Sequence, residues 1–329
     1  MSGVRFRVVT TDEKAIRLDR WFRRHFPELT HAHLEKLLRK GEIRVNGQRA
    51  KAGLRLETGQ RVRVPPLCGS PKTFTKRAPS QVAASDAKAL RERVLYKDEE
   101  LIAIDKPAGL AVQGGTKTMR HVDGMLEALR FGKKERPRLV HRLDKDTSGV
   151  LVLARSAAAA SWLTAAFRNK TIRKIYWALV CGVPIPDQAE IALPIMKRTV
   201  GERERVVADR SKGKAARTLY AVLDKAGSKA AWLALMPLTG RTHQLRVHCA
   251  AKGTPVLGDN KYGGTAERFE GTGIVRRLHL HAIEIELLHP QKGKVRITAP
   301  LPEDLCESWA ALGFDPKLKV NPFKNVKLP

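Results

Sequence analysis

The chain has 329 residues, of which 43% are hydrophobic, so it is long enough for one large domain or for a large and a small domain with separate cores. Lysine and arginine outnumber aspartate and glutamate by 62 to 33, and this net charge of +29 is spread along the chain, which favours a nucleic-acid partner over an acidic membrane surface. The four cysteines are widely separated and form no CxxC pair, which argues against a zinc site or a disulfide framework. The charged N-terminal stretch argues against an export signal, and the lack of an apolar run of about 18 residues argues against a membrane span. We therefore expect a cytoplasmic protein.

The first segment, residues 1–65, is unusually basic, with 16 lysines and arginines against 7 acidic residues. Leu18, Trp21 and Phe22 have helical spacing, and a second helix is expected between Thr30 and Gly41, with short strands after it. Two helices and a small sheet with cationic outer faces predict an RNA-binding module, although a merely solvated charged surface is the alternative. The cations that we expect to contact RNA are Arg23, Arg24, Arg39, Lys40 and Arg44.

Residues 66–90 are predicted to be a flexible linker, because prolines alternate with Ser, Lys and Ala and no apolar period is present. At the other end, residues 314–329 form a basic tail to which the pattern assigns no structure. We expect the main domain to lie between these segments, over residues 91–313.

Short apolar runs that predict strands dominate residues 91–313. They lie at 101–104, 149–154, 174–180, 219–223, 231–235, 282–287 and 294–297. Helices are expected at 156–167 and 242–252. Because the strands do not alternate regularly with helices, the sequence predicts an α+β fold with a mainly antiparallel sheet.

The segment HRLDKDTSG at 141–149 is rich in loop-forming residues and precedes an apolar strand. Asp144 is flanked by Arg142 and Lys145, and nearby cations keep a carboxylate ionised, as a nucleophile must be. Asp146 follows two residues later, so a two-carboxylate site is a further interpretation. The alternative is a polar turn in which either carboxylate only caps the backbone.

Two further segments carry polar groups suited to a functional site. Residues 239–248 open the second predicted helix with two arginines and two histidines, and such a helix start can bind phosphate or pair with a buried carboxylate. His243 and His248 lie five residues apart, on different helix faces, so we expect no metal site. Tyr176, in the strand at 174–180, is either a core residue or a group that stacks on a base or transfers a proton.

Nucleotide-binding motifs are not found in the sequence. There is no GxxxxGK[ST] phosphate loop and no GxGxxG after a strand, and Gly114-Gly115 does not supply one. We therefore expect no nucleotide, dinucleotide or methyl-donor cofactor.

Six segments along residues 91–301 resemble, in the same order, the RluA family of pseudouridine synthases. The three that resemble its motifs are HRLDKDTSGVLVLAR at 141–155, KIYWALVCG at 174–182 and PLTGRTHQLRVH at 237–248. The three that resemble the surrounding segments are DKPAGLAVQGG at 105–115, VLGDNKYG at 256–263 and LHLHAIEIELLHP at 278–290. Residues 1–65 are similar to the ribosomal-protein-type (S-four-like) RNA-binding module that precedes the catalytic domain in several members.

The resemblance implies a pseudouridine synthase fold and a reaction without a cofactor. In that reaction the N1–C1′ glycosidic bond of a uridine breaks, the base turns, and it rejoins the sugar through C5. The resemblance identifies Asp144 as the invariant catalytic aspartate and Arg246 as its partner. It identifies Tyr176 as the active-site tyrosine that packs on the base and could also remove a proton. The neighbouring residues that we expect to contact RNA are His141, Arg142 and Arg241, of which Arg142 would fill the space left by the extruded nucleotide.

The expected partner is large-subunit ribosomal RNA, since the segments at 114–118 and 197–207, together with the module, are similar to a subfamily that modifies it. We expect a monomer that needs no membrane. Two other classes remain open: a non-catalytic ribosome-assembly protein that binds RNA, and a phosphate-ester hydrolase that uses Asp144, Asp146 and a divalent metal ion.

Overall fold

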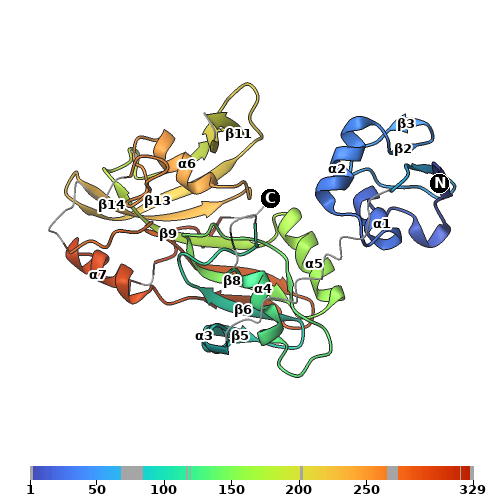
Figure 1. Ribbon diagram of the computed structural model, residues 1–329. Coiled ribbons are helices and arrows are strands. Elements are labelled where there is room, and N and C mark those ends of the chain that lie inside the picture. Colours follow the sequence, from blue (N-terminus) through green and yellow to red (C-terminus); the bar gives the residue numbers. More distant parts are fainter. Residues whose placement is uncertain are drawn as a thin grey trace. The chain divides into compact units, whose positions relative to one another are not determined.

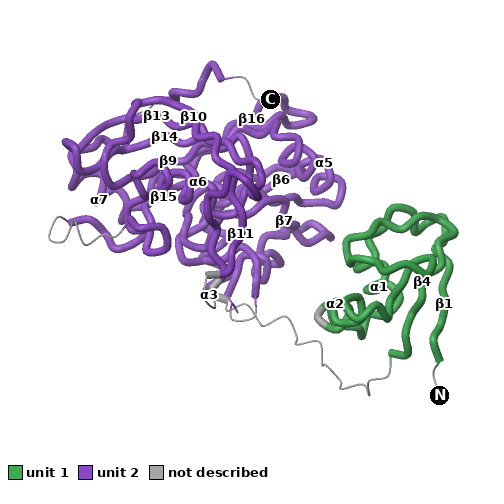
Figure 2. The backbone as a smooth tube through the Cα atoms, turned by 90° about the horizontal axis from the view of Figure 1, so that it is seen from above, with its two compact units in different colours: residues 1–78 green, residues 79–329 purple. Residues whose placement is uncertain are grey.

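The structure is a computed structural model and describes residues 3–67, 84–115, 118, 120–200, 203–264, 273–318 and 320–326. The chain divides into two units, residues 1–78 and 79–329, which Figure 2 shows in different colours. Each unit has its own sheet and its own buried hydrophobic residues, as a separately folded domain requires.

The smaller unit combines two helices with a four-stranded antiparallel sheet in the order β1-β4-β2-β3 (Figure 1). Its elements are β1 (Arg5–Val8), η1 (Thr11–Glu13), α1 (Leu18–His25), α2 (His31–Lys40), β2 (Arg44–Val45), β3 (Gln48–Arg49) and β4 (Arg61–Val64). Thr30 caps α2 by accepting a hydrogen bond from the His33 backbone at 3.2 Å, and Gly41 ends the helix with a left-handed φ of 72°. The predicted bounds of this helix are confirmed.

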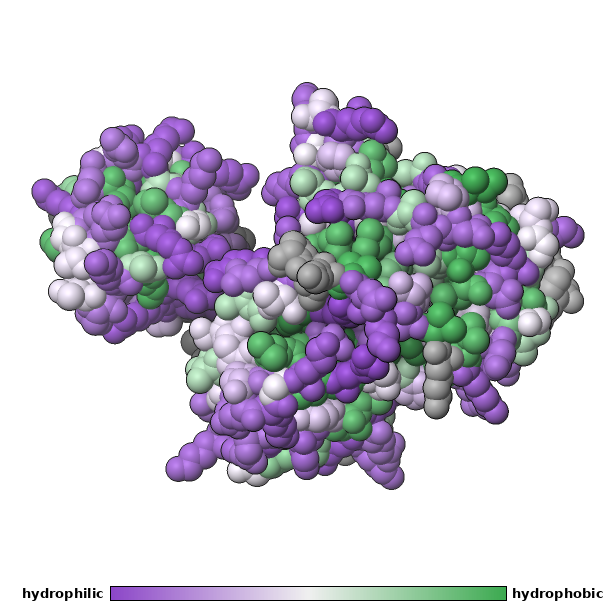
Figure 3. Space-filling view, turned by 180° about the vertical axis from the view of Figure 1, so that it is seen from behind, coloured by the Kyte–Doolittle hydropathy of each residue, from purple (hydrophilic) through white to green (hydrophobic). Residues whose placement is uncertain are grey.

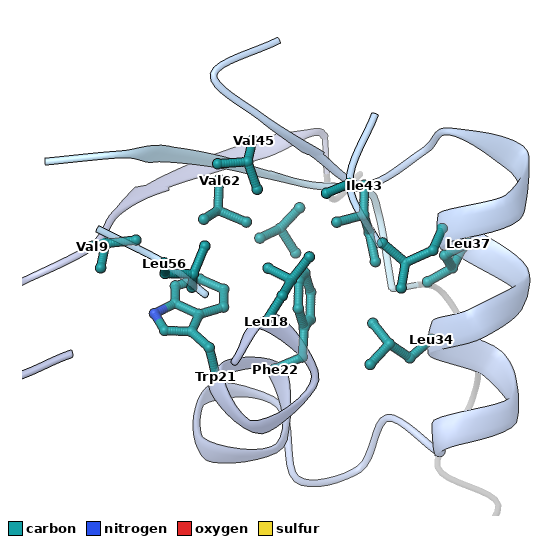
Figure 4. Packing of buried hydrophobic residues seen from close by; sticks show 13 residues of the cluster. Val9, Leu18, Trp21, Phe22, Leu34, Leu37, Ile43, Val45, Leu56 and Val62 are labelled. Carbon is teal, nitrogen blue, oxygen red and sulfur yellow. The ribbon is translucent and has the colours of Figure 1, made fainter. Parts of the chain in front are cut away.

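The core of the smaller unit lies between its helices and its sheet (Figure 4). Leu18, Trp21 and Phe22 of α1 are at most 1% exposed, and Leu34 and Leu37 of α2 pack in the same cluster. The helical spacing of apolar residues therefore identified the inward faces, which leaves the basic residues on the outside.

The larger unit is built on a ten-stranded sheet in the order β10-β13-β14-β9-β15-β8-β6-β5, with β16 paired to β15 and β7 to β8. The strands are β5 (Val94–Lys97), β6 (Leu101–Lys106), β7 (Arg138–Leu139), β8 (Ser148–Ala154), β9 (Arg173–Cys181), β10 (Gln188–Ala192), β13 (Arg217–Ala226), β14 (Ala230–Pro237), β15 (Leu280–His289) and β16 (Gly293–Thr298). Among the described pairs of this sheet, only β15 and β8 run parallel. The predicted α+β class with a mainly antiparallel sheet is confirmed.

Helices pack on both faces of this sheet. They are α3 (Ala84–Glu92), α4 (Val122–Met125), η2 (Leu126–Leu129), α5 (Ala157–Arg168), α6 (Gln244–Ala251) and α7 (Glu303–Ala311). α5 packs on the face of β6 that carries Leu101 and Ala103, whereas α3, α4 and η2 pack on the face that carries Ile102 and Ile104. α6 and α7 likewise cover opposite faces of β9 and β14. Both faces of the central strands are therefore buried, which explains their continuous apolar runs.

A separate antiparallel hairpin of β11 (Ile195–Val200) and β12 (Arg203–Ala208) lies outside the large sheet, next to α6 (Figure 1). Its sequence interrupts apolar residues with a run of charged ones, so hydrophobic periodicity does not predict it. Hydrophilic residues dominate the visible face of both units in Figure 3. None of the described helices has the length and apolar character needed to cross a bilayer.

The structure corrects two segment assignments. Of the predicted linker 66–90, residues 68–83 lie outside the described part of the chain, but residues 84–90 belong to α3. The predicted tail 314–329 is packed over its described part, since Phe314 is 4% exposed and Phe323 is fully buried in the core of the larger unit. The Arg173 side chain also donates hydrogen bonds to the carbonyls of Phe323 and Val326. The basic composition of residues 314–329 gave no indication in the sequence that these two phenylalanines are buried.

Candidate active site

Asp144 lies in the loop between β7 and β8, and a buried lysine braces this loop. Lys106, at the end of β6, is fully buried and donates hydrogen bonds to the carbonyls of Pro107 at 2.7 Å, Leu110 at 2.9 Å and Lys145 at 3.0 Å. The acceptor in the loop is the carbonyl next to Asp144. Lys106 thus attaches the backbone of the Asp144 loop to the end of β6.

Gly149 brings β8 against β15. It has a φ of 107°, and a Cβ at this position would lie 2.3 Å from the carbonyl oxygen of Ala282 in β15. Only glycine allows the two backbones to approach so closely. Because Asp144 lies five residues before Gly149, this approach helps to determine where the loop leaves the sheet.

The Asp144 loop opens into a pocket with a volume of about 720 Å³. Asp144 is the only carboxylate among the described residues that line the pocket, and its side chain is 24% exposed. Seven cations line the same pocket: Arg142, Lys145, Arg168, Lys170, Lys174, Arg241 and Arg246. A single acid among many bases suits a polyanion that must reach one carboxylate.

Tyr176 of β9 lines the same pocket and packs against the hydrophobic clusters on either side of it. Burial and, secondarily, the charge of Asp144 raise the pKa of its phenol above the usual value. The hydroxyl therefore stays protonated at neutral pH. The residue can offer a ring face for stacking and a hydroxyl as a hydrogen-bond donor, but not a phenolate.

Arg246 of α6 is buried and is held by a second acid. Its Nε and Nη2 atoms donate to the two oxygens of Asp259, each at 2.7 Å, and the Asp259 side chain is fully buried. Its remaining nitrogen, Nη1, lies 3.9 Å from Oδ2 of Asp144. The expected pairing of Arg246 with Asp144 is therefore only a loose ion pair, because the fork of the guanidinium is occupied by Asp259.

His243 also faces Asp144, with 4.0 Å between its Nε2 and Oδ1 of the carboxylate. It precedes α6 in a left-handed conformation, φ 53°, and its Nδ1 lies 2.8 Å from the hydroxyl of Tyr262. In sequence, His243 belongs to the segment 239–248, which was expected to bind phosphate or to pair with a buried carboxylate and not to hold a metal ion. No group of three potential metal ligands occurs among the described residues. Its position at the carboxylate comes from the tight turn before α6.

Comparison with known proteins places this geometry in a family. The sequence profile of RNA pseudouridylate synthase matches residues 100–251, and that of the S4 domain matches residues 16–62. Ribosomal large subunit pseudouridine synthase C of Vibrio cholerae is 36% identical over 304 residues, which cover 91% of this chain and 93% of the relative. The chain belongs to the RNA pseudouridylate synthase family.

Other members support this assignment at similar levels. Ribosomal large subunit pseudouridine synthase C of Escherichia coli K12 is 35% identical over 312 residues, covering 92% of this chain and 95% of the relative. Among solved structures, human RNA pseudouridylate synthase domain containing 4 is 31% identical, with a TM-score of 0.58 over 69% of this chain and 95% of that one. The chain is thus a pseudouridine synthase, and its family resemblance in sequence is confirmed.

The residues of this pseudouridine synthase that were expected to contact RNA near Asp144 differ in character. Arg142 and Arg241 are exposed at the pocket, and their guanidinium groups contact Gln113 Oε1 at 3.4 Å and the Ala215 carbonyl at 3.3 Å. His141 accepts a hydrogen bond from the Val152 backbone at 2.8 Å. Burial and the charge of Lys174 lower the pKa of His141 to about 3, so it lines the pocket as a neutral group.

The two-carboxylate interpretation does not fit the synthase pocket. Asp146 is exposed and is not among the described residues that line the pocket, although it lies two residues from Asp144. Asp144 is therefore the acid that a substrate in this pocket can reach.

The S4 region of the synthase places its predicted RNA contacts on the surface. Arg23 and Arg39 are exposed, whereas Arg24 is paired with Asp12 at 3.0 Å. Lys40 lies 3.7 Å from Glu42, and Arg44 donates to the carbonyls of Gly41 and Gly47, each at 3.1 Å. The cations thus differ in how freely they can reach a phosphate.

Proposed function

We propose that the enzyme converts specific uridines of large-subunit ribosomal RNA to pseudouridine, with Asp144 as the catalytic nucleophile and no cofactor. The observation that carries this proposal is the position of Asp144 as the only acid among the described residues of a cationic pocket, beside Tyr176 and Arg246. The named relatives, which act on the large ribosomal subunit, support the choice of RNA.

The proposed reaction needs few chemical groups beyond these residues. The N1–C1′ bond breaks, a C5–C1′ bond forms, C5 loses a proton and N1 gains one, so the product is an isomer of the substrate. Asp144 attacks C1′ or C6, while the Arg246 guanidinium lies 3.9 Å from its carboxylate and Tyr176 stacks on the base. Extruding the uridine from its RNA helix costs roughly a few kcal/mol. Contacts between the pocket cations and the RNA backbone offset this cost.

We further propose that residues 1–65 bind RNA, that residues 91–313 carry the chemistry, and that the enzyme acts as a cytoplasmic monomer. An RNA-binding module on the same chain raises the effective concentration of substrate at the pocket. The match to the S4 domain and the exposed Arg23 and Arg39 support this role.

The direct test of the reaction uses large-subunit RNA that carries tritium at C5 of uridine. Purified enzyme should release tritium into water, and release should continue in excess chelator. A protein that only assists ribosome assembly would bind the RNA and release no tritium. A metal-dependent phosphate-ester hydrolase would also release none, because it does not break the C5–H bond, and its cleavage of the RNA would stop when the chelator is added.

Neutralising the module should weaken binding more than chemistry. We expect Arg23→Gln with Arg39→Gln to raise the Kd for ribosomal RNA roughly tenfold and to reduce the salt dependence of binding by about two phosphate contacts. The single-turnover rate at saturating RNA should stay within about twofold of the wild type. Arg24→Gln, whose guanidinium is already paired with Asp12, is the matched comparison and should have a smaller effect. An unchanged Kd in the double variant would show that these cations of the module do not contribute to RNA binding.

The pH dependence of RNA binding should show the contribution of the Lys174 charge to the affinity. This pocket residue lies two positions from Tyr176, and burial lowers its pKa to about 8. The cation is therefore present below that pH and is lost above it, so the Kd should rise about fivefold between roughly pH 7 and pH 9. Lys174→Met should abolish this rise, whereas Lys170→Met, at an exposed lysine of the same pocket, should retain it. A pH response that persists in Lys174→Met would assign it to another group.

A further inference from the structure

The β11–β12 hairpin combines an exposed cationic surface with a buried anchor. Lys197, Arg198 and Arg205 are exposed, whereas Ile195 and Val206 are at most 5% exposed. The two buried residues pack in one cluster with Val247 of α6 and Tyr262. A hairpin of this kind can contact an RNA backbone on one side and transmit its position to α6 on the other.

Tyr262 lies between the hairpin and His243, which lines the pocket. Val206 of the hairpin packs with Tyr262 in the same buried cluster, and burial raises the pKa of the phenol. The Tyr262 ring lies between two guanidinium groups, with Arg205 at 5.2 Å and Arg246 at 5.1 Å from its centroid. Arg205 also donates to the Lys261 carbonyl.

The hydroxyl of Tyr262 contacts His243. It lies 2.8 Å from Nδ1 of His243, and a neutral imidazole can accept the hydroxyl proton at this nitrogen. Burial lowers the pKa of His243, against the opposing charge of Asp144, so the ring is neutral at neutral pH. With Nδ1 as acceptor, the ring proton lies on Nε2, which faces Oδ1 of Asp144 at 4.0 Å.

We propose that His243 and Tyr262 are positioning residues that couple the seating of the β11–β12 hairpin on RNA to the orientation of the Asp144 carboxylate. The proposal rests on the proposed function and adds a control of the same site. The chain of contacts runs from Val206, which packs with Tyr262, through the Tyr262 hydroxyl and His243 to Asp144. At 4.0 Å the last contact is longer than a hydrogen bond, and it closes when a nucleotide fills the pocket.

The test is single-turnover formation of pseudouridine in a large-subunit RNA fragment, with the RNA Kd measured in parallel. Tyr262→Phe removes only the hydroxyl, and His243→Asn removes Nε2 while keeping a residue that tolerates the left-handed backbone. Each should lower the rate at saturating RNA by about tenfold and leave the Kd within about twofold. The double variant should be no slower than either single variant, because both break one chain of contacts.

The link to the hairpin is tested with Arg198→Gln. In the wild-type background we expect this exposed substitution to slow the single-turnover step by about threefold, and in the Tyr262→Phe background to have no further effect. Tyr96→Phe is the matched control: the Tyr96 hydroxyl is hydrogen-bonded to Asp98 at 2.7 Å and to Lys292 at 3.0 Å, and neither of these residues lines the pocket. This control should react at the wild-type rate.

The proposal is overturned if Tyr262→Phe and His243→Asn both react at the wild-type rate, if their effects multiply, or if Arg198→Gln slows both backgrounds equally. His243→Asn decides the point alone if Tyr262→Phe does not fold, as judged by its thermal unfolding. Failure of the proposed function has a different signature, since the wild-type enzyme would then form no pseudouridine in the RNA fragment.

Discussion

Asp144→Asn is expected to reduce the single-turnover formation of pseudouridine by a factor on the order of 10⁴ or more, while the Kd for ribosomal RNA changes by less than about twofold. The amide has nearly the shape of the carboxylate but is neutral and cannot act as a nucleophile. Binding survives because the seven cations that line the pocket, and not Asp144, attract the RNA.

The matched control for this variant is Asp146→Asn. It makes the same chemical change two residues away, on a side chain that is exposed and does not belong to the pocket lining. It should therefore retain at least about half of the wild-type rate. If both variants were equally slow, the effect would belong to the loop as a whole, and turnover by Asp144→Asn would refute the nucleophile assignment.

Arg246→Met is expected to destabilise the larger unit by about 3–5 kcal/mol, because it leaves the fully buried Asp259 carboxylate without its cation. The melting temperature of that unit should fall by roughly 10 °C. Activity should fall as well, since the guanidinium is also the nearest buried cation to Asp144. Calorimetric unfolding and the single-turnover rate measure the two effects separately.

Two further variants separate the buried pair from a general loss of charge. Adding Asp259→Asn to Arg246→Met should recover part of the lost stability, because the uncompensated charge is then removed. Arg217→Met breaks the exposed pair with Glu190 and should cost less than about 1 kcal/mol. Equal destabilisation by Arg246→Met and Arg217→Met would contradict the role given to Asp259.

The sequence could predict the parts of the fold and site that depend on local pattern. Helical spacing identified the inward face of α1, the Thr30 cap and Gly41 set the ends of α2, and the loop around Asp144 followed from its turn-forming residues. Apolar runs identified central strands such as β8 and β14, since both faces of these strands are buried.

Properties that depend on contacts between distant segments could not be predicted in this way. The partner of Arg246 is Asp259, thirteen residues further on, and nothing in the third motif indicates that this acid occupies the guanidinium. The neutral state of His141 could not be predicted either, because its burial and its hydrogen bond from Val152 arise only in the folded sheet. Phe323, in a basic segment, was missed because its cluster comes from strands far earlier in the chain.

The most direct measurement of the central claim is carbodiimide labelling and primer extension on large-subunit ribosomal RNA from cells that lack the gene. The account predicts that stops at particular uridines disappear, return when the wild-type gene is supplied, and do not return with Asp144→Asn. Unchanged stops in the deletion strain, or their full restoration by Asp144→Asn, would contradict it.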